Sequence, residues 1–360
     1  MSLQEHIDVT LGQRSYPIWI GRNLLGDPTL WRTRLRGRQV LIVSNETVAP
    51  LYLSRVQTAL GDIHHGTLIL ADGEEFKTLQ SVARIFDALA ALGAQRDACV
   101  LALGGGVVGD MAGFAAACWM RGIDFVQMPT TLLAMVDASV GGKTAVDLAA
   151  GKNLVGAFHQ PRAVVIDTDA LSTLPGRDYR AGLAEVVKHS AIGDAGHFAW
   201  LEQHAESLLA RDGDTLARVI AHDCAFKAGV VARDETEQGE RALLNFGHSF
   251  GHALETVTGY AALRHGEAVA IGMGMAARLS TRLGMASAAD AERLDALLTA
   301  LGLPTSAPVG FDADAALAVM RLDKKNLSGR LRLILWRGIG RAEIVEGIAE
   351  SAVSETLKGE

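Results

Sequence analysis

The chain has 360 residues, enough for two domains with separate cores, and its 49% hydrophobic and 21% charged residues are typical of a globular protein. A net charge of −7 without a Lys- or Arg-rich stretch excludes general nucleic-acid binding. The three cysteines form no CxxC pair, no cationic and apolar leader opens the chain, and no apolar run reaches the roughly 18 residues of a membrane helix. We therefore expect a soluble, cytoplasmic protein with reduced cysteines.

The first half of the chain alternates between short strands and helices. Apolar runs on either side of residues 12–14 predict a hairpin over residues 8–21. Helices are expected at Leu79–Leu92 and Val107–Met120. The strands expected around them are Gln39–Ser44, Gly66–Ala71, Ala98–Leu103, Asp124–Met128 and Ala163–Asp167. This alternation predicts a parallel sheet with crossover helices, and hence a Rossmann-like α/β domain over residues 1–175.

The second half is dominated by long Ala- and Leu-rich segments with a period of 3.6 residues. The helices expected there are Arg180–Ile192, Leu216–Arg233, Leu244–Thr258, Glu267–Leu283 and Ala289–Leu301. A small hairpin is expected from Arg330–Trp336 and Ala342–Val345. These segments predict a mainly α-helical domain over residues 176–360.

A run of three glycines, Gly104 to Gly106, follows the expected strand that ends at Leu103 and precedes an apolar helix. Glycines in this place let the backbone approach a pyrophosphate, which the free N–H groups of the helix then bind. Three glycines alone are explained at least as often by a tight turn that binds no ligand as by a pyrophosphate site. Two further polar segments, Asp72–Lys77 and Pro129–Thr131, follow other expected strands. Because ligands gather at the carboxyl ends of such strands, the three segments together favour a nucleotide site.

The segment Gly141-Gly142-Lys143-Thr144 is similar to the end of a phosphate-binding loop, but Asp137 occupies the position of its first glycine. We therefore reject an ATPase. Lys143 and Lys152 can be ordinary solvated lysines, although the glycines around them and the adjacent Asn153 slightly favour contacts with an anion.

Two histidines and an asparagine recur at helical spacing in the second half. Asn245, His248 and His252 are separated by three and four residues, which places them on one face of a helix. Ser249 replaces the glutamate of the metalloprotease motif HExxH, so a protease is not expected. With His265 as a further imidazole and Glu185 as a carboxylate, the set is typical of a catalytic zinc site, although each histidine alone is more often a surface residue.

Several cations accompany this candidate metal helix, and each of them alone is best explained as part of a solvated helix face. In an acidic protein their number beside a candidate metal site suggests an anionic substrate. They are Lys188, Lys227, Arg241, Lys324 and Lys325.

Taken in order, these motifs resemble the 3-dehydroquinate synthase family, a branch of the sugar phosphate cyclases. The resemblance spans residues 40 to 340. Its segments are Asp72 through Lys77, Gly104 through Asp110, Pro129 through Thr131, Asp137 through Lys143, Gly151 through Asn153, Gly182 through Lys188, Asn245 through His252, Arg264 through Glu267, and Asp323 through Lys325.

The resemblance implies a phosphate-eliminating cyclase, a carbon–oxygen lyase of the shikimate pathway, that acts on a seven-carbon keto-acid sugar phosphate. It implies NAD⁺, a divalent metal such as Zn²⁺ or Co²⁺, and a homodimer. It assigns the metal to Glu185, His248 and His265. It assigns NAD⁺ to Asp72, Gly73, Glu74, Lys77, Gly105, Gly106, Val107, Asp110, Thr130, Thr131, Asp137, Lys143, Lys152 and Thr173. Substrate binding and proton transfer fall to His252, Lys143, Asn153, Lys188, Lys227, Arg241, Asn245 and Lys324 or Lys325, with Arg121 reaching a neighbouring subunit.

Three other classes remain to be distinguished. Sister cyclases with substrates that carry no charge except phosphate should lack the cations directed at a carboxylate. Metal-dependent polyol dehydrogenases usually have serine where this chain has Val107. A non-catalytic NAD-binding module would have no use for the candidate metal ligands.

Overall fold

The structure is a computed structural model that describes residues 2–259, 262–321 and 331–359. The chain forms two compact units. The first comprises Met1–Leu174 and Leu216–Thr236, and the second comprises Pro175–Thr215 and Glu237–Glu360. A single division after residue 175 would place residues 216–236 in the second unit, whereas the structure groups them with the first.

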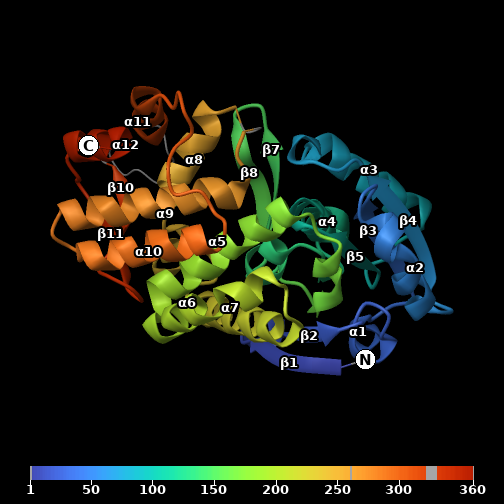
Figure 1. The fold of residues 1–360 in the computed structure, drawn as a ribbon. Coiled ribbons are helices and arrows are strands. Elements are labelled where there is room, and N and C mark those ends of the chain that lie inside the picture. Colours follow the sequence, from blue (N-terminus) through green and yellow to red (C-terminus); the bar gives the residue numbers. More distant parts are fainter. Residues whose placement is uncertain (1, 260–261, 322–330, 360) are drawn as a thin grey trace. The chain divides into compact units, whose positions relative to one another are not determined.

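The first unit is built on a seven-stranded sheet (Figure 1). Its strands are β1 (Ser2–Val9), β2 (Tyr16–Arg22), β3 (Gln39–Asn45), β4 (His64–Leu70), β5 (Cys99–Gly104), β6 (Asp124–Pro129) and β9 (Ala163–Asp167). The strand order is β1-β2-β9-β6-β5-β3-β4, in which β1 and β2 form an antiparallel hairpin and all other neighbours are parallel. The predicted hairpin and parallel sheet are both confirmed.

The central strands are buried along their whole length because helices cover the sheet. Every residue of β5, β6 and β9 is buried, which explains their continuous apolar sequences. The helices of this unit are α1 (Pro28–Trp31), α2 (Ala49–Leu60), α3 (Leu79–Ala91) and α4 (Gly106–Cys118), together with most of α7 (Gly213–Arg233). One core cluster joins Leu89 of α3, Val100 of β5 and Met111 of α4.

The order of the strands creates a switch point at the carboxyl edge of the sheet. The chain passes from β3 outward to β4 and then returns to add β5 on the other side of β3. In open parallel sheets, ligands bind at the carboxyl ends of strands beside such a reversal. The segments that follow β4, β5 and β6 therefore share one edge, as the sequence predicted.

A second hairpin in the first unit was not predicted from the sequence. It consists of β7 (Lys143–Leu148) and β8 (Gly151–Phe158), and it follows a π-helical turn at Ala134–Ala138. Its strands are only partly buried, and β8 contains Gly151 and Gly156, so they lack the apolar runs by which the central strands were identified. Lys143, Lys152 and Asn153 consequently lie on a hairpin.

The second unit is mainly helical (Figure 1). Its helices are α5 (Gly176–Gly193), α6 (Ala195–Leu209), α8 (His248–Val257), α9 (His265–Arg282), α10 (Ala288–Ala300), α11 (Ala313–Arg321) and α12 (Glu350–Lys358). The predicted small hairpin is present as β10 (Arg332–Trp336) and β11 (Ala342–Glu346). The expected combination of a parallel α/β region with a mainly helical region is confirmed.

One predicted helix of this unit is interrupted. The sequence suggested a single helix over 244–258, but Asn245 ends a 3₁₀ helix at Glu240–Asn245, and α8 begins only at His248. Gly247 separates the two with a φ of +79°, a conformation that side chains other than glycine rarely adopt. The placement of Asn245 on one helical face with His248 and His252 was therefore wrong, whereas the two histidines do share α8.

The glycines around α8 allow very close packing against α9. A Cβ atom on Gly272 of α9 would overlap the carbonyl oxygen of Gly247. A Cβ on Gly251 would lie 3.2 Å from the carbonyl carbon of Ala268. The first turn of α9 also presses against α5, since a Cβ on Gly266 would overlap the carbonyl oxygen of Ala181. These contacts bring the start of α9 close to α5 and α8.

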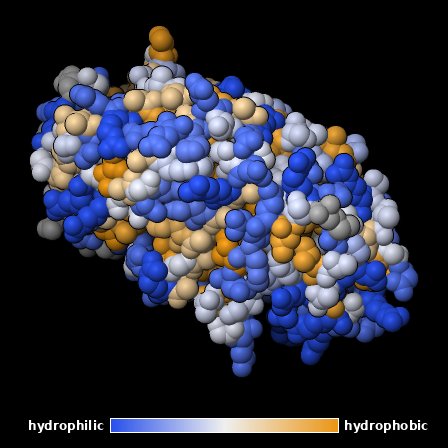
Figure 2. Space-filling model, turned by 60° about the horizontal axis from the view of Figure 1, so that its bottom comes forward, coloured by the Kyte–Doolittle hydropathy of each residue, from blue (hydrophilic) through white to orange (hydrophobic). Residues whose placement is uncertain are grey.

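None of the described helices has both the length and the apolar character of a membrane span. Figure 2 shows one face of the molecule, on which hydrophobic residues form patches between hydrophilic ones.

Candidate active site

The turn between β5 and α4 forms an open cradle at the carboxyl edge of the sheet. β5 ends at Gly104 and α4 begins at Gly106, so the first N–H groups of the helix face out of the turn. A Cβ on Gly105 would lie 3.2 Å from Cγ2 of Thr131. Within the described residues, the buried hydroxyl of Thr130 has no hydrogen-bond partner. An orphaned hydroxyl beside a glycine turn fits a site for a nucleotide.

The carboxylate of Asp72 is held in place after β4. Asn45 Nδ2 donates a hydrogen bond of 2.6 Å to Asp72 Oδ1, and the Thr47 hydroxyl donates one of 2.7 Å to Oδ2. Glu74 follows, with Oε1 at 3.7 Å from Nζ of Lys152. The carboxylate oxygens of Asp72 keep acceptor capacity for ribose hydroxyls. Thr47 was not among the residues selected from the sequence, because its partner follows a different strand.

A buried ion pair lies close by in the first unit. Nζ of Lys77 is 2.6 Å from Oδ2 of Asp110 and donates a 2.7 Å hydrogen bond to Oδ1 of Asn153. Burial lowers the pKa of Lys77, but the carboxylates of Asp110 and Glu74 outweigh this effect and raise the pKa above its ordinary value. Lys77 therefore remains protonated and connects α4 to the β7–β8 hairpin.

Three other predicted residues of the first unit, Lys227, Asp137 and Thr173, have polar partners. Lys227 on α7 donates a hydrogen bond of 2.6 Å to the carbonyl oxygen of Asp137 and a second to its Oδ1. The hydroxyl of Thr173 forms a hydrogen bond with that of Tyr52, and both residues line a cavity of about 470 Å³. The cavity is lined by Arg22, Leu51, Tyr52, Arg55, Asp169, Ser172 and Thr173.

The remaining predicted residues of the first unit are two exposed cations and residues in the turns after β4 and β5. Arg121 is exposed with a φ of +68°, and Lys143 is exposed at the start of β7. Val107 lies in the first turn of α4. Gly73, with a φ of +133°, precedes a 3₁₀ turn.

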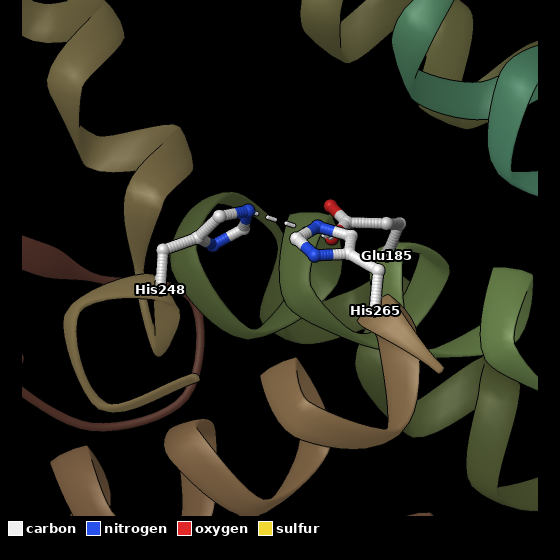
Figure 3. Close-up of side chains that lie close together, drawn as sticks. All are labelled: Glu185, His248 and His265. Carbon is white, nitrogen blue, oxygen red and sulfur yellow. Dashed lines mark ion pairs between the residues drawn. The ribbon is translucent and has the colours of Figure 1, made fainter. Parts of the chain in front are cut away.

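In the second unit, three predicted metal ligands converge from three helices. Oε1 of Glu185 on α5 lies 3.8 Å from Nε2 of His248 on α8 and 4.0 Å from Nε2 of His265 on α9. Figure 3 shows both imidazoles pointing toward the Glu185 carboxylate. One ligand atom from each of the three residues lies within 4.8 Å of the others.

The chemistry of these donor atoms fits a divalent metal. Oε1 of Glu185 is buried and has no hydrogen-bond partner in the described part of the chain. A buried carboxylate oxygen without a donor is costly unless a cation binds it. The other oxygen, Oε2, accepts a hydrogen bond from Lys188 one turn later on α5. Two imidazoles and one carboxylate form a frequent catalytic zinc set.

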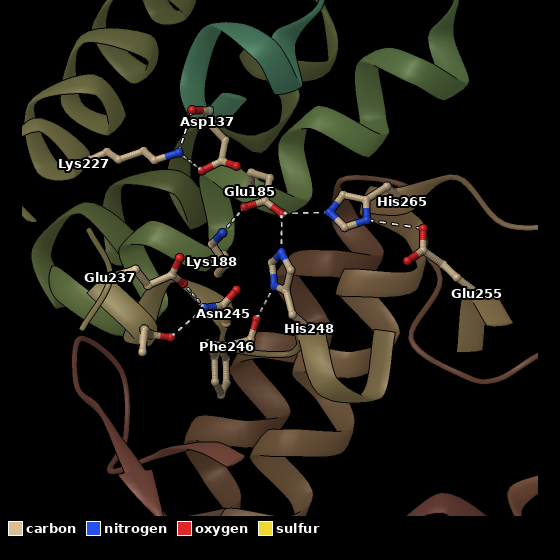
Figure 4. A network of polar contacts seen from close by, with 11 residues as sticks. Asp137, Glu185, Lys188, Lys227, Glu237, Asn245, Phe246, His248, Glu255 and His265 are labelled. Carbon is tan, nitrogen blue, oxygen red and sulfur yellow. Dashed lines mark hydrogen bonds and ion pairs between the residues drawn. The ribbon is translucent and has the colours of Figure 1, made fainter. Parts of the chain in front are cut away.

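Each imidazole has a second contact that fixes its orientation (Figure 4). Nδ1 of His248 lies 3.2 Å from the carbonyl oxygen of Phe246, and Nδ1 of His265 lies 3.4 Å from Oε1 of Glu255. Burial lowers the pKa of His265, but the carboxylates of Glu255 and Glu185 outweigh this effect and raise it above its ordinary value. The site therefore favours positive charge. Glu255 was not selected from the sequence.

Three more predicted residues belong to this unit. The imidazole of His252 is exposed, with its ring centre 5.5 Å from that of His248. Arg241 is almost fully buried in the 3₁₀ helix. Asn245 Nδ2 donates hydrogen bonds to Oε1 of Glu237 and to the carbonyl oxygen of Ala242. Lys324 and Lys325 lie outside the described residues.

The sequence matches two family models along most of its length. Residues 67–181 match the model described as 3-dehydroquinate synthase N-terminal, and residues 182–326 match the model described as 3-dehydroquinate synthase C-terminal. A curated 3-dehydroquinate synthase of Xanthomonas campestris pv. campestris is 58% identical over 96% of both chains. One from Xylella fastidiosa is 56% identical over 95% of both chains.

Solved structures of two sister enzymes have closely similar folds. The 2-epi-5-epi-valiolone synthase of Streptomyces hygroscopicus, with NAD⁺ and Zn²⁺ bound, is 32% identical with a TM-score of 0.89 and covers 97% of this chain and 98% of its own. A 2-deoxy-scyllo-inosose synthase, complexed with carbaglucose-6-phosphate, NAD⁺ and Co²⁺, is 28% identical with a TM-score of 0.90 and covers 99% and 100%. A glycerol dehydrogenase of Schizosaccharomyces pombe, 16% identical with a TM-score of 0.66 over 95% of this chain and 88% of its own, shares the fold. By its match to both domain models and to the curated relatives over nearly its whole length, the chain belongs to the 3-dehydroquinate synthase family.

Proposed function

We propose that this protein converts 3-deoxy-D-arabino-heptulosonate 7-phosphate to 3-dehydroquinate and phosphate, a step of the shikimate pathway. The observation that carries the proposal is the identity of 56–58% to curated 3-dehydroquinate synthases over at least 95% of both chains. The reaction is a carbon–oxygen lyase reaction that combines transient oxidation by NAD⁺, loss of phosphate, re-reduction and intramolecular aldol closure.

The proposed cofactors are NAD⁺ and one divalent metal ion, Zn²⁺ or Co²⁺. Bound NAD⁺ supplies a reversible hydride acceptor, and a bound divalent ion lowers the pKa of hydroxyl oxygens and polarises a carbonyl. The two sister cyclases, which bind NAD⁺ with Zn²⁺ or Co²⁺, support this choice. In this chain, Glu185, His248 and His265 would hold the metal.

For NAD⁺, we propose that the cradle of Gly105 and Gly106 binds the pyrophosphate through backbone N–H groups. The hydroxyl of Thr130 would gain a partner in the cofactor, and the carboxylate of Asp72 would accept a hydrogen bond from a ribose hydroxyl. The Lys77–Asp110 pair would fix the N-terminal part of α4 behind the cofactor. The other residues proposed to contact NAD⁺ are Gly73, Glu74, Val107, Thr131, Asp137, Lys143, Lys152 and Thr173.

For the substrate, a carboxylate at one end and a phosphate at the other require cations at both ends. The residues proposed to bind them are Lys143, Asn153, Lys188, Lys227, Arg241, Asn245 and either Lys324 or Lys325. The exposed imidazole of His252 lies beside the metal ligands and would move a proton at a ring nitrogen. Arg121 would reach the site of a second copy in a homodimer.

The sister cyclases are the closest alternative, because their fold does not distinguish them from this chain. A direct comparison of substrates separates the possibilities. With NAD⁺ and Zn²⁺ supplied, the protein should release phosphate from the seven-carbon keto-acid phosphate, and only traces from glucose 6-phosphate or from a seven-carbon sugar phosphate without a carboxylate. Preferential turnover of either uncarboxylated substrate would instead make the protein a sister cyclase.

A further inference from the structure

Glu255 is a buried carboxylate at the metal site that is not one of the three converging ligands. It lies on α8, seven residues after His248 and three after His252, and only 4% of it is exposed. A charged side chain is rarely buried to this extent unless it has a partner. Oε1 of Glu255 lies 3.4 Å from Nδ1 of His265, which serves as such a partner.

The two ring nitrogens of His265 face two different carboxylates (Figure 4). Nε2 is directed at Oε1 of Glu185 and Nδ1 at Oε1 of Glu255. A neutral imidazole carries one proton, and a carboxylate can only accept it. With the proton on Nδ1, Nε2 presents its lone pair toward Glu185, which is the form that binds a metal.

His248 has the same arrangement with a weaker acceptor. Its Nδ1 faces the neutral carbonyl oxygen of Phe246, whereas Nδ1 of His265 faces a carboxylate. The carboxylate adds negative charge, which matters because Lys188 already compensates the charge of Glu185. Without Glu255, the three ligands and Lys188 together would offer no net negative charge to a divalent cation.

We propose that Glu255 is a positioning residue: it fixes the tautomer and orientation of His265 and supplies the charge that tightens metal binding. The inference rests on the metal site of the proposed function. Glu255 would not itself bind the ion.

The alternative is that Glu255 is a ligand, since His252, Glu255 and His265 also have ligand atoms within 4.8 Å of one another. One imidazole cannot direct both of its nitrogens at the same ion. The cluster of Glu185, His248 and His265 is the better metal site, because it includes Oε1 of Glu185. This buried oxygen has no hydrogen-bond partner among the described residues. His252, by contrast, is exposed.

The test measures metal binding without turnover. Metal-free wild type, Glu255→Gln and Glu255→Ala are titrated with Co²⁺, followed by visible absorption and by competition with a chelator. Glu292→Gln is the matched control, because it makes the same change on the exposed side of α10. We expect Glu255→Ala to weaken Co²⁺ binding by about 10- to 100-fold and to shift the cobalt spectrum. This is the usual effect of removing a residue that hydrogen-bonds to a metal ligand. Glu255→Gln should lose less, because its amide oxygen still accepts from Nδ1, and the control should match wild type.

Two results would overturn the proposal. In the first, both variants bind Co²⁺ within about twofold of wild type and show its spectrum. In the second, X-ray absorption of the Zn²⁺-loaded Gln variant shows one oxygen ligand fewer than wild type, which would make Glu255 a ligand. If the Ala variant does not fold by circular dichroism, the Gln variant decides. Wild type that binds no metal would reject the proposed metal site itself, a result distinct from failure of the Glu255 inference alone.

Discussion

Lys188 and Glu185 form a fully buried ion pair one helical turn apart on α5, in which Nζ of Lys188 donates a hydrogen bond to Oε2 of Glu185. This bond uses only one of the two carboxylate oxygens of Glu185. Oε2 is occupied by the lysine, while Oε1 faces Nε2 of His248 and of His265. The pair therefore keeps a metal-binding oxygen in place inside the protein before any cation arrives.

The first prediction concerns this carboxylate. Glu185→Gln removes an anionic ligand and leaves the buried ammonium of Lys188 without its counter-charge. We expect the free energy of unfolding of the metal-free protein to fall by about 3–5 kcal/mol. Residues that only hydrogen-bond to a metal ligand typically change metal affinity by up to ~100-fold. Zn²⁺ affinity should fall by more than this, because Glu185 is itself a ligand. Urea unfolding and chelator competition measure the two effects, and unchanged Zn²⁺ affinity would exclude Glu185 as a ligand.

Lys227 and Arg241 are predicted to act on the substrate rather than on NAD⁺. Lys227→Ala and Arg241→Ala each remove a charged donor, which is worth about 1.5–3 kcal/mol in a hydrogen bond. Steady-state kinetics should then show kcat/KM lower by about 10- to 100-fold. The dissociation constant of NAD⁺, measured by calorimetry, should stay close to that of wild type. If kcat and KM were both unchanged in both variants, the assignment of these cations to the substrate would be wrong.

The packing of α8 against α9 predicts a strong effect of a single methyl group. In Gly272→Ala, the new Cβ would overlap the carbonyl oxygen of Gly247 and approach the backbone nitrogen of Gly251, so the helices must move apart. We expect a loss of about 1–3 kcal/mol or more in the free energy of unfolding. Gly213→Ala is the control, because its Cβ would meet no atom within 4 Å. Equal stability of the two variants in urea would contradict this account.

The start of α9 should be stabilised in a pH-dependent way. Arg177 donates two hydrogen bonds of 2.7 Å to Glu267, and the N–H of Arg264 donates a third. Burial raises the pKa of Glu267, but these bonds outweigh it and leave the pKa below its ordinary value. The stabilisation is therefore complete above the unfolded-state pKa, about 4.3, and is lost as the pH falls through the lower folded-state pKa.

Glu267→Gln should accordingly lower the free energy of unfolding by about 0.5–1 kcal/mol at neutral pH. The difference from wild type should shrink as the pH falls below about 4. Urea unfolding over this range measures it. A difference that grows on acidification would show that the ionised form of Glu267 does not stabilise the fold.

Much of the fold and the site could be predicted because it depends on local patterns. The buried strands β5, β6 and β9 are continuous apolar runs, and the glycine turn after β5 has a direct physical reason. Of the candidate metal residues, helical spacing identifies only His248 and His252 as a pair, and the choice of Glu185, His248 and His265 followed from the resemblance to the family. The structure brings these three residues, which the resemblance named, together from three helices.

The rest depends on contacts between distant segments. From the sequence, Gly247 could lie within a helix or interrupt one. The interruption depends on the close packing of α9, in which Gly272 lies against the backbone of Gly247. Glu255 is only one of many glutamates on helices until His265 is placed opposite it. The β7–β8 hairpin was missed because its partly exposed strands have weak patterns.

The most direct test of the central claim follows phosphate and NADH together. The protein is given NAD⁺ and 3-deoxy-D-arabino-heptulosonate 7-phosphate, before and after its metal has been removed with a chelator. We predict phosphate release that disappears on chelation, returns with Zn²⁺ or Co²⁺, and proceeds without net accumulation of NADH. Phosphate release that is unaffected by the chelator, or NADH that accumulates in step with phosphate, would contradict the proposed metal-dependent reaction with its internal redox cycle.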